Sequence, residues 1–270
     1  MTVITHMNVD LDAACSVWAA KILGPYGDHN IRFVPANWPG PVVEGDVAVD
    51  IPVGIKGEES CFGTLLSMWG TPEDKAALRA VRAFVDAQDS SGSAIKALAP
   101  DLDRGVQQVF AGTCMNAIFR AGQRQLAGHD HRTVEWWGEI LTGLHKAGLA
   151  RLRAEQEADK AQLFGPVALV VNSREFATNG VLFERGIRAV VFVDGLNLGV
   201  CREGSEKTRM DHPAIKAVVT AAGELEEWFS HPAGFLFARG TRKAPATTAS
   251  AVNPELLARA VWDALEQEQP

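Results

Sequence analysis

The chain has 270 residues, of which 47% are hydrophobic and 22% charged, and its formal net charge is −7 at pH 7. This length is enough for one large or two smaller domains, and the sequence has no bilayer-spanning apolar run, no basic secretory leader and no closely spaced pair among its four cysteines. We therefore expect a cytoplasmic protein with no membrane partner, and the negative charge argues against binding to long nucleic acid, which depends on neutralised phosphates.

Polar side chains follow the first apolar segment of the chain. Val3 and Ile4 predict the end of a buried strand, and a helix is predicted from Ala13 to Leu23. The intervening residues His6, Asp10 and Asp12 then fall on a strand-to-helix turn, where open α/β sheets bind ligands. Imidazole and carboxylate together favour a divalent metal site. The alternative is that an Asp caps the helix and His6 is an ordinary surface residue.

The next two predicted strands are Ile31–Pro35 and Asp46–Ile51, and the second carries Asp50 at its carboxyl end. A carboxylate at that point would lie beside the polar cluster of the first strand, so Asp50 is a second candidate metal ligand. The alternative is a cap on the following turn.

Helices are predicted at Ser60–Met68 and Pro72–Asp86, the latter opened by a proline and an acidic residue. Asp86 and Asp89 are three residues apart, so on a helix both would lie on one face. A pair of acids on an exposed helix face is the alternative to a ligand role.

A change of pattern divides the rest of the chain. Leu141–Leu163 has the composition of a long connecting helix, which Gly165-Pro166 ends, and short apolar strands follow. The predicted strands are 167–171, 189–193 and 234–238. We expect an α/β protein with a parallel-sheet N-terminal domain at residues 1–150, a connecting helix at 151–164 and a smaller α/β C-terminal domain at 165–270.

A basic, glycine-containing stretch at residues 231–245 is the candidate phosphate-binding segment. Arginine offers a planar donor fork to phosphate and lysine a point charge, and the glycines allow close backbone approach. His231 could face a cleft or cap a turn, and a solvated basic loop is the alternative for the whole segment. The candidate substrate-binding residues are Arg239, Arg242, Lys243, Gly240 and His231.

The motif T-H-x-N-x-D-x-D-A at the start of the chain resembles the first motif of the DHH phosphoesterase superfamily. The resemblance implies a two-domain α/β enzyme, mostly Mn-dependent, that cleaves phosphodiester or phosphoanhydride bonds. It also implies that Asp50 bridges two metal ions and that an acid on a later helix, for which we choose Asp89 over Asp86, completes the site. The implied metal ligands are His6, Asp10, Asp12, Asp50 and Asp89, with Asp50 and Asp12 also catalytic.

The chain departs from that family at its central motif. No histidine lies between His29 and His129, and the interval 52–66 offers Lys56, Glu58 and Glu59 where the family has Asp-His-His. A single metal, a glutamate as substitute ligand, or loss of hydrolysis with retained binding would each explain this.

The predicted function is that of a phosphohydrolase that uses Mn or Mg on a small nucleotide or short oligonucleotide. The alternative is a non-catalytic nucleotide-binding or regulatory protein with a degenerate DHH-type site. The expected partner is a small phosphorylated substrate, and a homodimer is left open.

Overall fold

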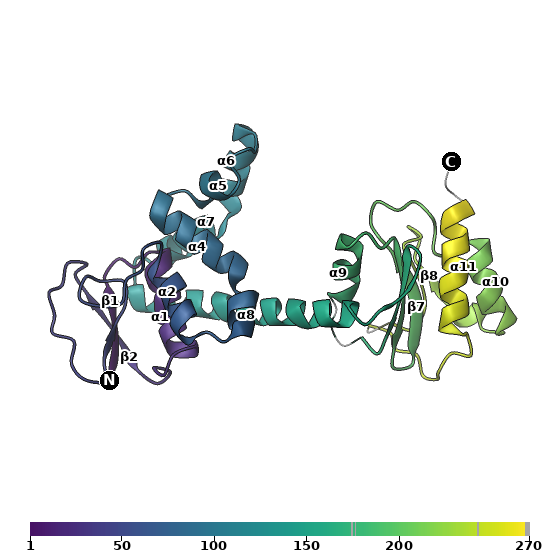
Figure 1. Ribbon diagram of the computed structural model, residues 1–270, viewed down its shortest axis with the longest axis horizontal. Helices are drawn as coiled ribbons and strands as arrows, with labels where there is room; N and C mark the ends of the chain where they lie inside the picture. The colour runs from purple at the N-terminus through teal and green to yellow at the C-terminus, as the bar shows by residue number, and fades with distance from the viewer. Residues whose placement is uncertain (174, 176, 242, 268–270) are drawn as a thin grey trace. The chain divides into compact units, whose positions relative to one another are not determined.

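The computed structural model describes residues 1–173, 175, 177–241 and 243–267. Its described part confirms the predicted α/β class, and the chain divides into two compact units, Met1–Leu149 and Ala150–Pro270 (Figure 1). Each unit has a sheet of its own and is taken separately below. Among the described residues, no helix combines the length and the apolar character needed to cross a membrane.

The sheet of the first unit is parallel, with strand order β2-β1-β3. Ile4 in the central strand lies opposite Arg32 on one side and Ala48 on the other. The third strand is shorter than the predicted 46–51. Val49 still donates its N–H to Ile4 O of β1 at 2.8 Å, but it lies outside the strand and forms an isolated bridge with Ile55. The strands are β1 (Thr2–His6), β2 (Asn30–Val34) and β3 (Val47–Ala48).

Helices of the first unit enclose α1, whose residues from Leu11 to Ala20 are all buried. A helix that is apolar on every side must be covered on every side, and the alanines of α1 allow its neighbours to approach. Trp137 packs against it and donates its indole N–H to the Cys15 thiol at 3.3 Å. The helices are α1 (Leu11–Ile22), α2 (Cys61–Trp69), α3 (Pro72–Ala77), α4 (Arg79–Ser91), α5 (Ala94–Leu98), α6 (Arg104–Thr113), α7 (Met115–Gln125) and α8 (Asp130–Ala158).

The second unit is built on a mixed sheet of order β4-β5-β6-β7-β9-β8, in which β5 and β6 are parallel and the other pairs antiparallel. Its strands are β4 (Gln162–Phe164), β5 (Val167–Val171), β6 (Ala189–Asp194), β7 (Asn197–Arg202), β8 (Phe229–Ser230) and β9 (Leu236–Arg239). The helices are α9 (Thr178–Glu184), α10 (Pro213–Ala221), the short 3-10 helix η1 (Leu225–Glu227) and α11 (Pro254–Gln267).

Both faces of this second sheet are covered. Val167 and Leu169 of β5 belong to the core under α10 and α11, whereas Ala168 and Val170 pack toward α9 and the end of α8 (Figure 1). A strand buried on both faces is continuously apolar instead of alternating, which is why V-A-L-V-V was recognisable as a strand.

The connecting helix predicted at 151–164 ends early. Helix α8 ends at Ala158, and residues 162–164 form β4, with Phe164 paired to Val167. Gly165, at φ +55°, and Pro166 form the two-residue turn of a hairpin, so the Gly-Pro pair that marked a helix end on the sequence closes a β-turn here.

Candidate metal centre

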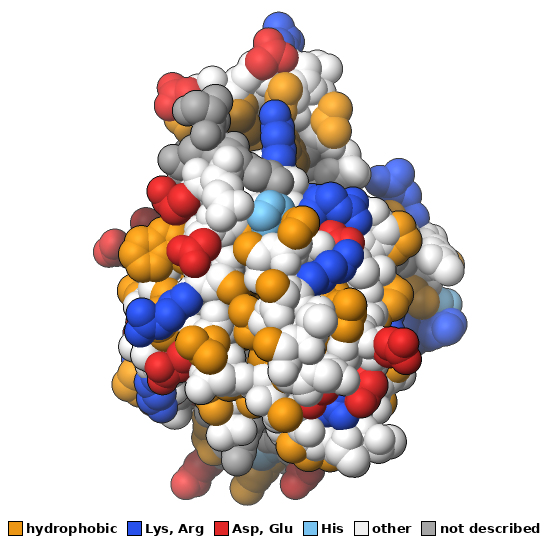
Figure 2. All heavy atoms as spheres, turned by 90° about the vertical axis from the view of Figure 1, so that its right-hand side faces the viewer, with side chains coloured by type: hydrophobic (Ala, Val, Ile, Leu, Met, Phe, Trp, Pro, Cys, Tyr) orange, Lys and Arg blue, Asp and Glu red, His pale blue; other side chains and the backbone are white. Residues whose placement is uncertain are grey.

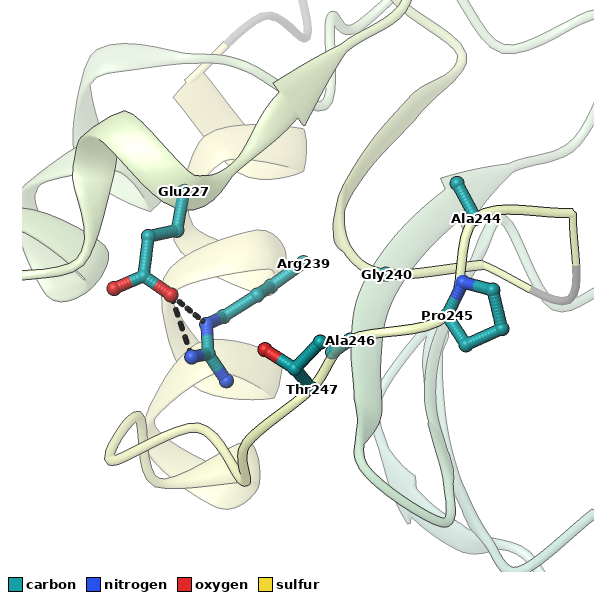
Figure 3. Close-up of a pocket in the computed structure, with 7 residues that line it drawn as sticks. All are labelled: Glu227, Arg239, Gly240, Ala244, Pro245, Ala246 and Thr247. Carbon is teal, nitrogen blue, oxygen red and sulfur yellow. Dashed lines mark hydrogen bonds and ion pairs between the residues drawn. The ribbon is translucent and has the colours of Figure 1, made fainter.

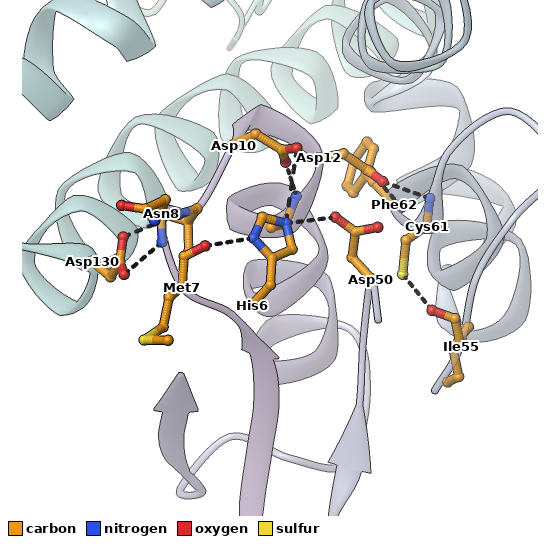
Figure 4. Close-up of polar contacts among 12 residues, drawn as sticks. His6, Met7, Asn8, Asp10, Asp12, Asp50, Ile55, Cys61, Phe62 and Asp130 are labelled. Carbon is orange, nitrogen blue, oxygen red and sulfur yellow. Dashed lines mark hydrogen bonds and ion pairs between the residues drawn. The ribbon is translucent and has the colours of Figure 1, made fainter. Parts of the chain in front are cut away.

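The carboxyl edge of the first sheet brings three candidate ligands together. His6 is the last residue of β1, Asp50 follows the neighbouring strand β3, and Asp10 is the N-cap of α1 (Figure 4). Because β1 and β3 are parallel neighbours, the side chains at their ends meet at one edge of the sheet. The cap of the helix after β1 adds the third group.

The ligand atoms of these three residues lie within 4.8 Å of one another, and we call them the metal triad. His6 Nε2 is 3.2 Å from Asp50 Oδ2 and 3.8 Å from Asp10 Oδ2. The side chains of His6 and Asp50 are nearly buried, whereas that of Asp10 is 58% exposed, so the triad opens to solvent on one side. One imidazole nitrogen and two carboxylates are the donor types that suit Mn²⁺ or another divalent ion.

The orientation of His6 is fixed by its other ring nitrogen. Nδ1 lies 2.9 Å from the Met7 carbonyl oxygen, which can only accept, so Nδ1 carries a proton. A neutral ring therefore presents the lone pair of Nε2 to the two carboxylates. The hydrogen bond to Asp50 raises the pKa of His6 to about 9, against the effect of burial, with further contributions from Met7 and Asp10. This position thus favours a positive charge, supplied either by a proton or by a metal ion.

Asp10 satisfies both alternatives posed by the sequence, since it caps α1 and belongs to the triad. Its Oδ1 accepts the N–H of Ala13 at 2.9 Å, while Oδ2 faces His6. Capping uses one carboxylate oxygen and leaves the other directed at His6, so the cap does not exclude the predicted ligand role, which stays a prediction.

Asp12 points to a different neighbour. Its two oxygens accept the N–H groups of Cys61 and Phe62, at 2.8 and 2.9 Å, at the start of α2. Burial and the negative charge of Asp50 raise its pKa to about 7, although the two N–H bonds act in the opposite direction. Asp12 is not among the groups that converge on the triad within the described residues, and its predicted ligand role stays a prediction.

Asp50 has a backbone conformation that non-glycine residues adopt rarely. Its φ is +53°, and its N–H donates to Ile55 O at 3.1 Å in the short loop that follows β3. A left-handed non-glycine residue costs on the order of 1 kcal/mol and persists where the surroundings impose it. Here the loop aims the carboxylate back at His6.

The acidic pair on α4 divides into two roles. Asp86 accepts hydrogen bonds from Ser60 Oγ and, at 3.1 Å, from Arg82 Nε, so it ties α4 to the start of α2. Asp89 is more exposed, and its pKa is raised by partial burial and by the negative charges of Asp50 and Asp10. The choice of Asp89 over Asp86 as a metal ligand stays a prediction.

The interval that replaces the family's central motif contributes no ligand to the triad among the described residues. Glu58 and Glu59 are exposed just before α2, whose N-cap is Ser60. Lys56 lies where its charge lowers the pKa of Asp89.

Two residues that the sequence analysis missed hold the turn between β1 and α1. Asp130, at the start of α8, accepts the N–H groups of Asn8 and Val9 (Figure 4). Gln123 of α7 donates to the Val9 carbonyl. Nothing in the sequence linked either residue to a turn more than a hundred residues away.

In the second unit, the first of the predicted phosphate-binding cations already has partners. Arg239 is 5% exposed; its Nε and Nη2 bind Glu227 at 2.8 and 2.5 Å, and its Nη1 and Nη2 bind the carbonyl and hydroxyl oxygens of Thr248. Its guanidinium therefore ties β9 to η1 and to the segment after β9. Phosphate binding by Arg239 stays a prediction.

A hollow of about 220 Å³ lies beside this arginine, lined by residues of the predicted segment (Figure 3). Gly240 lines it at φ +78°, and a Cβ there would lie 2.3 Å from Asn197 Oδ1, so only glycine fits. Lys243 is exposed next to the hollow's loop, and Arg242 lies outside the described residues. The lining residues are Glu227, Arg239, Gly240, Ala244, Pro245, Ala246 and Thr247.

His231 takes the turn-capping alternative. Its Nδ1 accepts the N–H of Ala233 at 3.2 Å, and its ring packs on Phe235 with centroids 4.1 Å apart.

On the face of this unit that carries α10 and α11, basic side chains are interspersed with acidic and apolar ones (Figure 2).

Comparison with known proteins gives structural likenesses only. No family model and no curated protein matches the sequence. The chain is similar to PggH, a pGpG-specific phosphodiesterase from Vibrio cholerae, at 10% identity and TM-score 0.28 over 99% of both chains. It is also similar to RecJ from Thermus thermophilus in complex with Mn²⁺, at 12% identity and TM-score 0.33, over 100% of this chain and 53% of RecJ.

The chain thus spans about half the length of that RecJ. Another similar structure, the exonuclease RecJ bound to manganese, is matched at 11% identity and TM-score 0.30. At these identities and TM-scores the likenesses carry no argument about activity, substrate or metal, which are inferred below from this chain's own residues.

Proposed function

We propose that this chain is a metal-dependent phosphohydrolase that acts on a small phosphorylated substrate, with a nucleotide or short oligonucleotide as the favoured class. The observation that carries the proposal is the metal triad: His6, Asp10 and Asp50 meet at the carboxyl edge of a parallel sheet, and Nδ1 of His6 is pinned so that Nε2 faces the two carboxylates. Buried or half-buried acids and an oriented imidazole are what a divalent ion requires.

The donor set suits such an ion, because the three ligand atoms already lie within 4.8 Å of one another. His6 Nε2, Asp10 Oδ2 and Asp50 Oδ2 would hold it, and the Met7 carbonyl keeps the imidazole in the required tautomer. A bound divalent ion supplies Lewis acidity, which lowers the pKa of a coordinated water and stabilises charge on a phosphate. The three ligands leave the exposed side, next to Asp10, for substrate.

Asp12 and Asp89 surround the triad with further carboxylates. Because the pKa of Asp12 is raised to about 7, this side chain can hold or release a proton near neutral pH. It is buried and held by two backbone N–H groups, so its position does not depend on solvent. We infer that Asp12 tunes the charge of the site and that Asp89 adds a carboxylate on its exposed flank.

The charge of the chain favours a small substrate over a long polyanion. The net charge of −7 disfavours long polyanions, while Lys243 and Arg242 add positive charge within the glycine-containing segment of the second unit. The basic residues would bind the phosphate of a small substrate, with Lys243 as the exposed point charge.

A non-catalytic nucleotide-binding protein is the second candidate. Glu58 and Glu59, the acids in the interval that lacks the family's histidines, are exposed and do not join the triad in the described part of the chain. A site with three convergent ligands could bind a metal–nucleotide complex without hydrolysing it.

The test is release of phosphate or nucleotide by metal-free protein, with Mn²⁺, Mg²⁺ or chelator added. The substrates are linear dinucleotides, cyclic dinucleotides, a nucleoside bisphosphate and pyrophosphate, and the variant is Asp50→Asn. Metal-dependent turnover that Asp50→Asn abolishes supports the hydrolase. Tight metal binding without turnover supports the binding protein, and absence of metal binding contradicts both.

A further inference from the structure

The turn between β1 and α1 joins two members of the metal triad. His6 precedes it and Asp10 follows it, so the conformation of Met7, Asn8 and Val9 sets where these two side chains meet. Asn8 has φ +56°, in the left-handed region that asparagine tolerates better than most residues. Asn8 thus tolerates the conformation of the turn, and the contacts described next hold it in place.

Each backbone N–H of this turn is bound by a residue from elsewhere in the first unit. Met7 N–H donates to Val34 O at 2.7 Å, and those of Asn8 and Val9 donate to Asp130 Oδ2 and Oδ1, at 2.9 and 3.0 Å. Gln123 Nε2 donates to the Val9 carbonyl at 2.9 Å. Figure 4 shows the Asp130 carboxylate facing the turn on the side away from Asp50.

A carboxylate that accepts two successive N–H groups fixes both the direction and the rotation of the peptide between them. Such charge-assisted bonds are about twice as strong as neutral ones. Asp130 is also the first residue of α8, where a negative charge is stabilised by the helix dipole. The anchor is thus tied to the longest helix of the first unit, which does not move with the turn.

We propose that Asp130, assisted by Gln123, is a positioning residue of the metal centre. By holding Asn8 and Val9, it keeps His6 Nε2 and Asp10 Oδ2 at 3.8 Å, close enough to bind one ion. Neither residue touches the ion or the substrate. This inference rests on the proposed function, since it assumes that the triad binds a metal.

The test is Mn²⁺ binding by metal-free protein, measured by titration calorimetry, together with the visible absorption spectrum of the Co²⁺-loaded protein. The variants are Asp130→Asn and Gln123→Met. In Asp130→Asn the amide group faces a backbone N–H, so one of the two hydrogen bonds is lost and the remaining one is no longer charge-assisted. Loss of an outer-shell partner weakens metal binding by roughly 10–100-fold, which is the increase in Kd expected for this variant.

Asp103→Asn is the matched control. Asp103 also accepts two backbone N–H groups at the start of a helix, from Gly105 and Val106, both at Oδ1, but it caps α6, and none of its hydrogen bonds in the described part of the chain reaches the turn. We expect it to leave the Mn²⁺ Kd and the Co²⁺ spectrum unchanged. If Asp130 only caps its helix, the two variants have the same Mn²⁺ Kd and the same Co²⁺ spectrum. If Asp130 positions the metal triad, the Kd and the spectrum change in Asp130→Asn alone.

The outcomes separate the two proposals. Wild-type affinity and spectrum in Asp130→Asn would overturn the positioning role and leave the proposed function standing. Failure of the wild-type protein to bind Mn²⁺ would overturn both. If Asp130→Asn does not fold, Gln123→Met decides, because it removes one bond to Val9 and should raise the Kd by about threefold; an unchanged Kd there overturns the proposal.

Discussion

Arg239 places a guanidinium inside the second unit, with Glu227 and Thr248 as direct partners and the buried Glu224 at 3.7 Å. Glu224 in turn accepts hydrogen bonds from Ser250 Oγ and the Ala251 N–H. Through these contacts one residue fixes the start and the end of the segment that follows β9. A buried cation with several acceptors is strongly coupled to folding, because its removal leaves the acceptors without charge compensation.

We therefore expect Arg239→Met to lower the free energy of unfolding by about 3 kcal/mol, since the buried Glu224 would lose its cation. Urea unfolding followed by circular dichroism measures this. Lys243→Ala, at an exposed position of the same segment, should change stability by less than about 0.5 kcal/mol. Equal stability of the two variants would show that Arg239 is not a structural cation.

For single residues, the sequence predicted which side chains gather at the candidate site better than it predicted the hydrogen-bond partners of those residues. His6, Asp10 and Asp50 were named together because strand ends converge, and the structure brings them together. The partners of Arg239 and the anchor Asp130 were missed, because a hydrogen bond between distant segments leaves no local pattern. Each of these contacts joins parts of the chain that lie close together only in the tertiary fold.

Among the elements, α3 and α8 approach each other unusually closely. A Cβ on Gly148 of α8 would lie 2.3 Å from the Ala77 carbonyl oxygen at the end of α3. Nearby, His145 Nε2 contacts Asp74 Oδ1 at 2.7 Å, and Asp74 also completes the capping box of α3 with Thr71. The two helices are thus joined by a backbone contact and an ion pair.

Gly148→Ala should lower the free energy of unfolding by about 1–3 kcal/mol, because the methyl group forces the two backbones apart. Gly143, in the same helix, has no atom within 4 Å of its would-be Cβ and is exposed. Gly143→Ala should therefore raise stability by about 0.5–1 kcal/mol through helix propensity alone. Changes of the same sign in thermal or urea unfolding of both variants would contradict the close contact.

Elements were predictable where one physical signal dominated. The apolar runs at β1, β5 and β6 led to strands in the right places, and the helix predicted at Ser60–Met68 matches α2 closely. The strand β4 was lost inside a helical composition, because three residues are too few to show a period and only pairing with β5 makes them a strand.

Across the whole molecule, each unit buries a core of its own, and the second unit depends on ionised carboxylates outside that core. Burial alone would raise the pKa of Glu206, but hydrogen bonds from Arg188 and Thr208 outweigh it and lower the pKa to about 2. The hydrogen bond from Arg209 lowers the pKa of Asp211 to about 2 as well, against burial and with help from Ser230 and Lys216.

These two carboxylates make the second unit sensitive to acid. Because their pKa values are lower in the folded than in the unfolded chain, the unfolded chain binds more protons as the pH falls. The stabilisation is complete above the unfolded pKa values, 4.5 for Glu206 and 3.8 for Asp211, and is lost as the pH falls toward about 2. We expect urea midpoints for peptides of the second unit, followed by pulsed hydrogen exchange and mass spectrometry, to fall steeply between about pH 5 and about pH 3. We expect the Glu206→Gln variant to be less stable at neutral pH and its urea midpoint to fall less steeply with pH, because one of the two titrating groups is gone. A fall as steep as in the wild type would mean that Glu206 is not ionised by its contacts with Arg188 and Thr208.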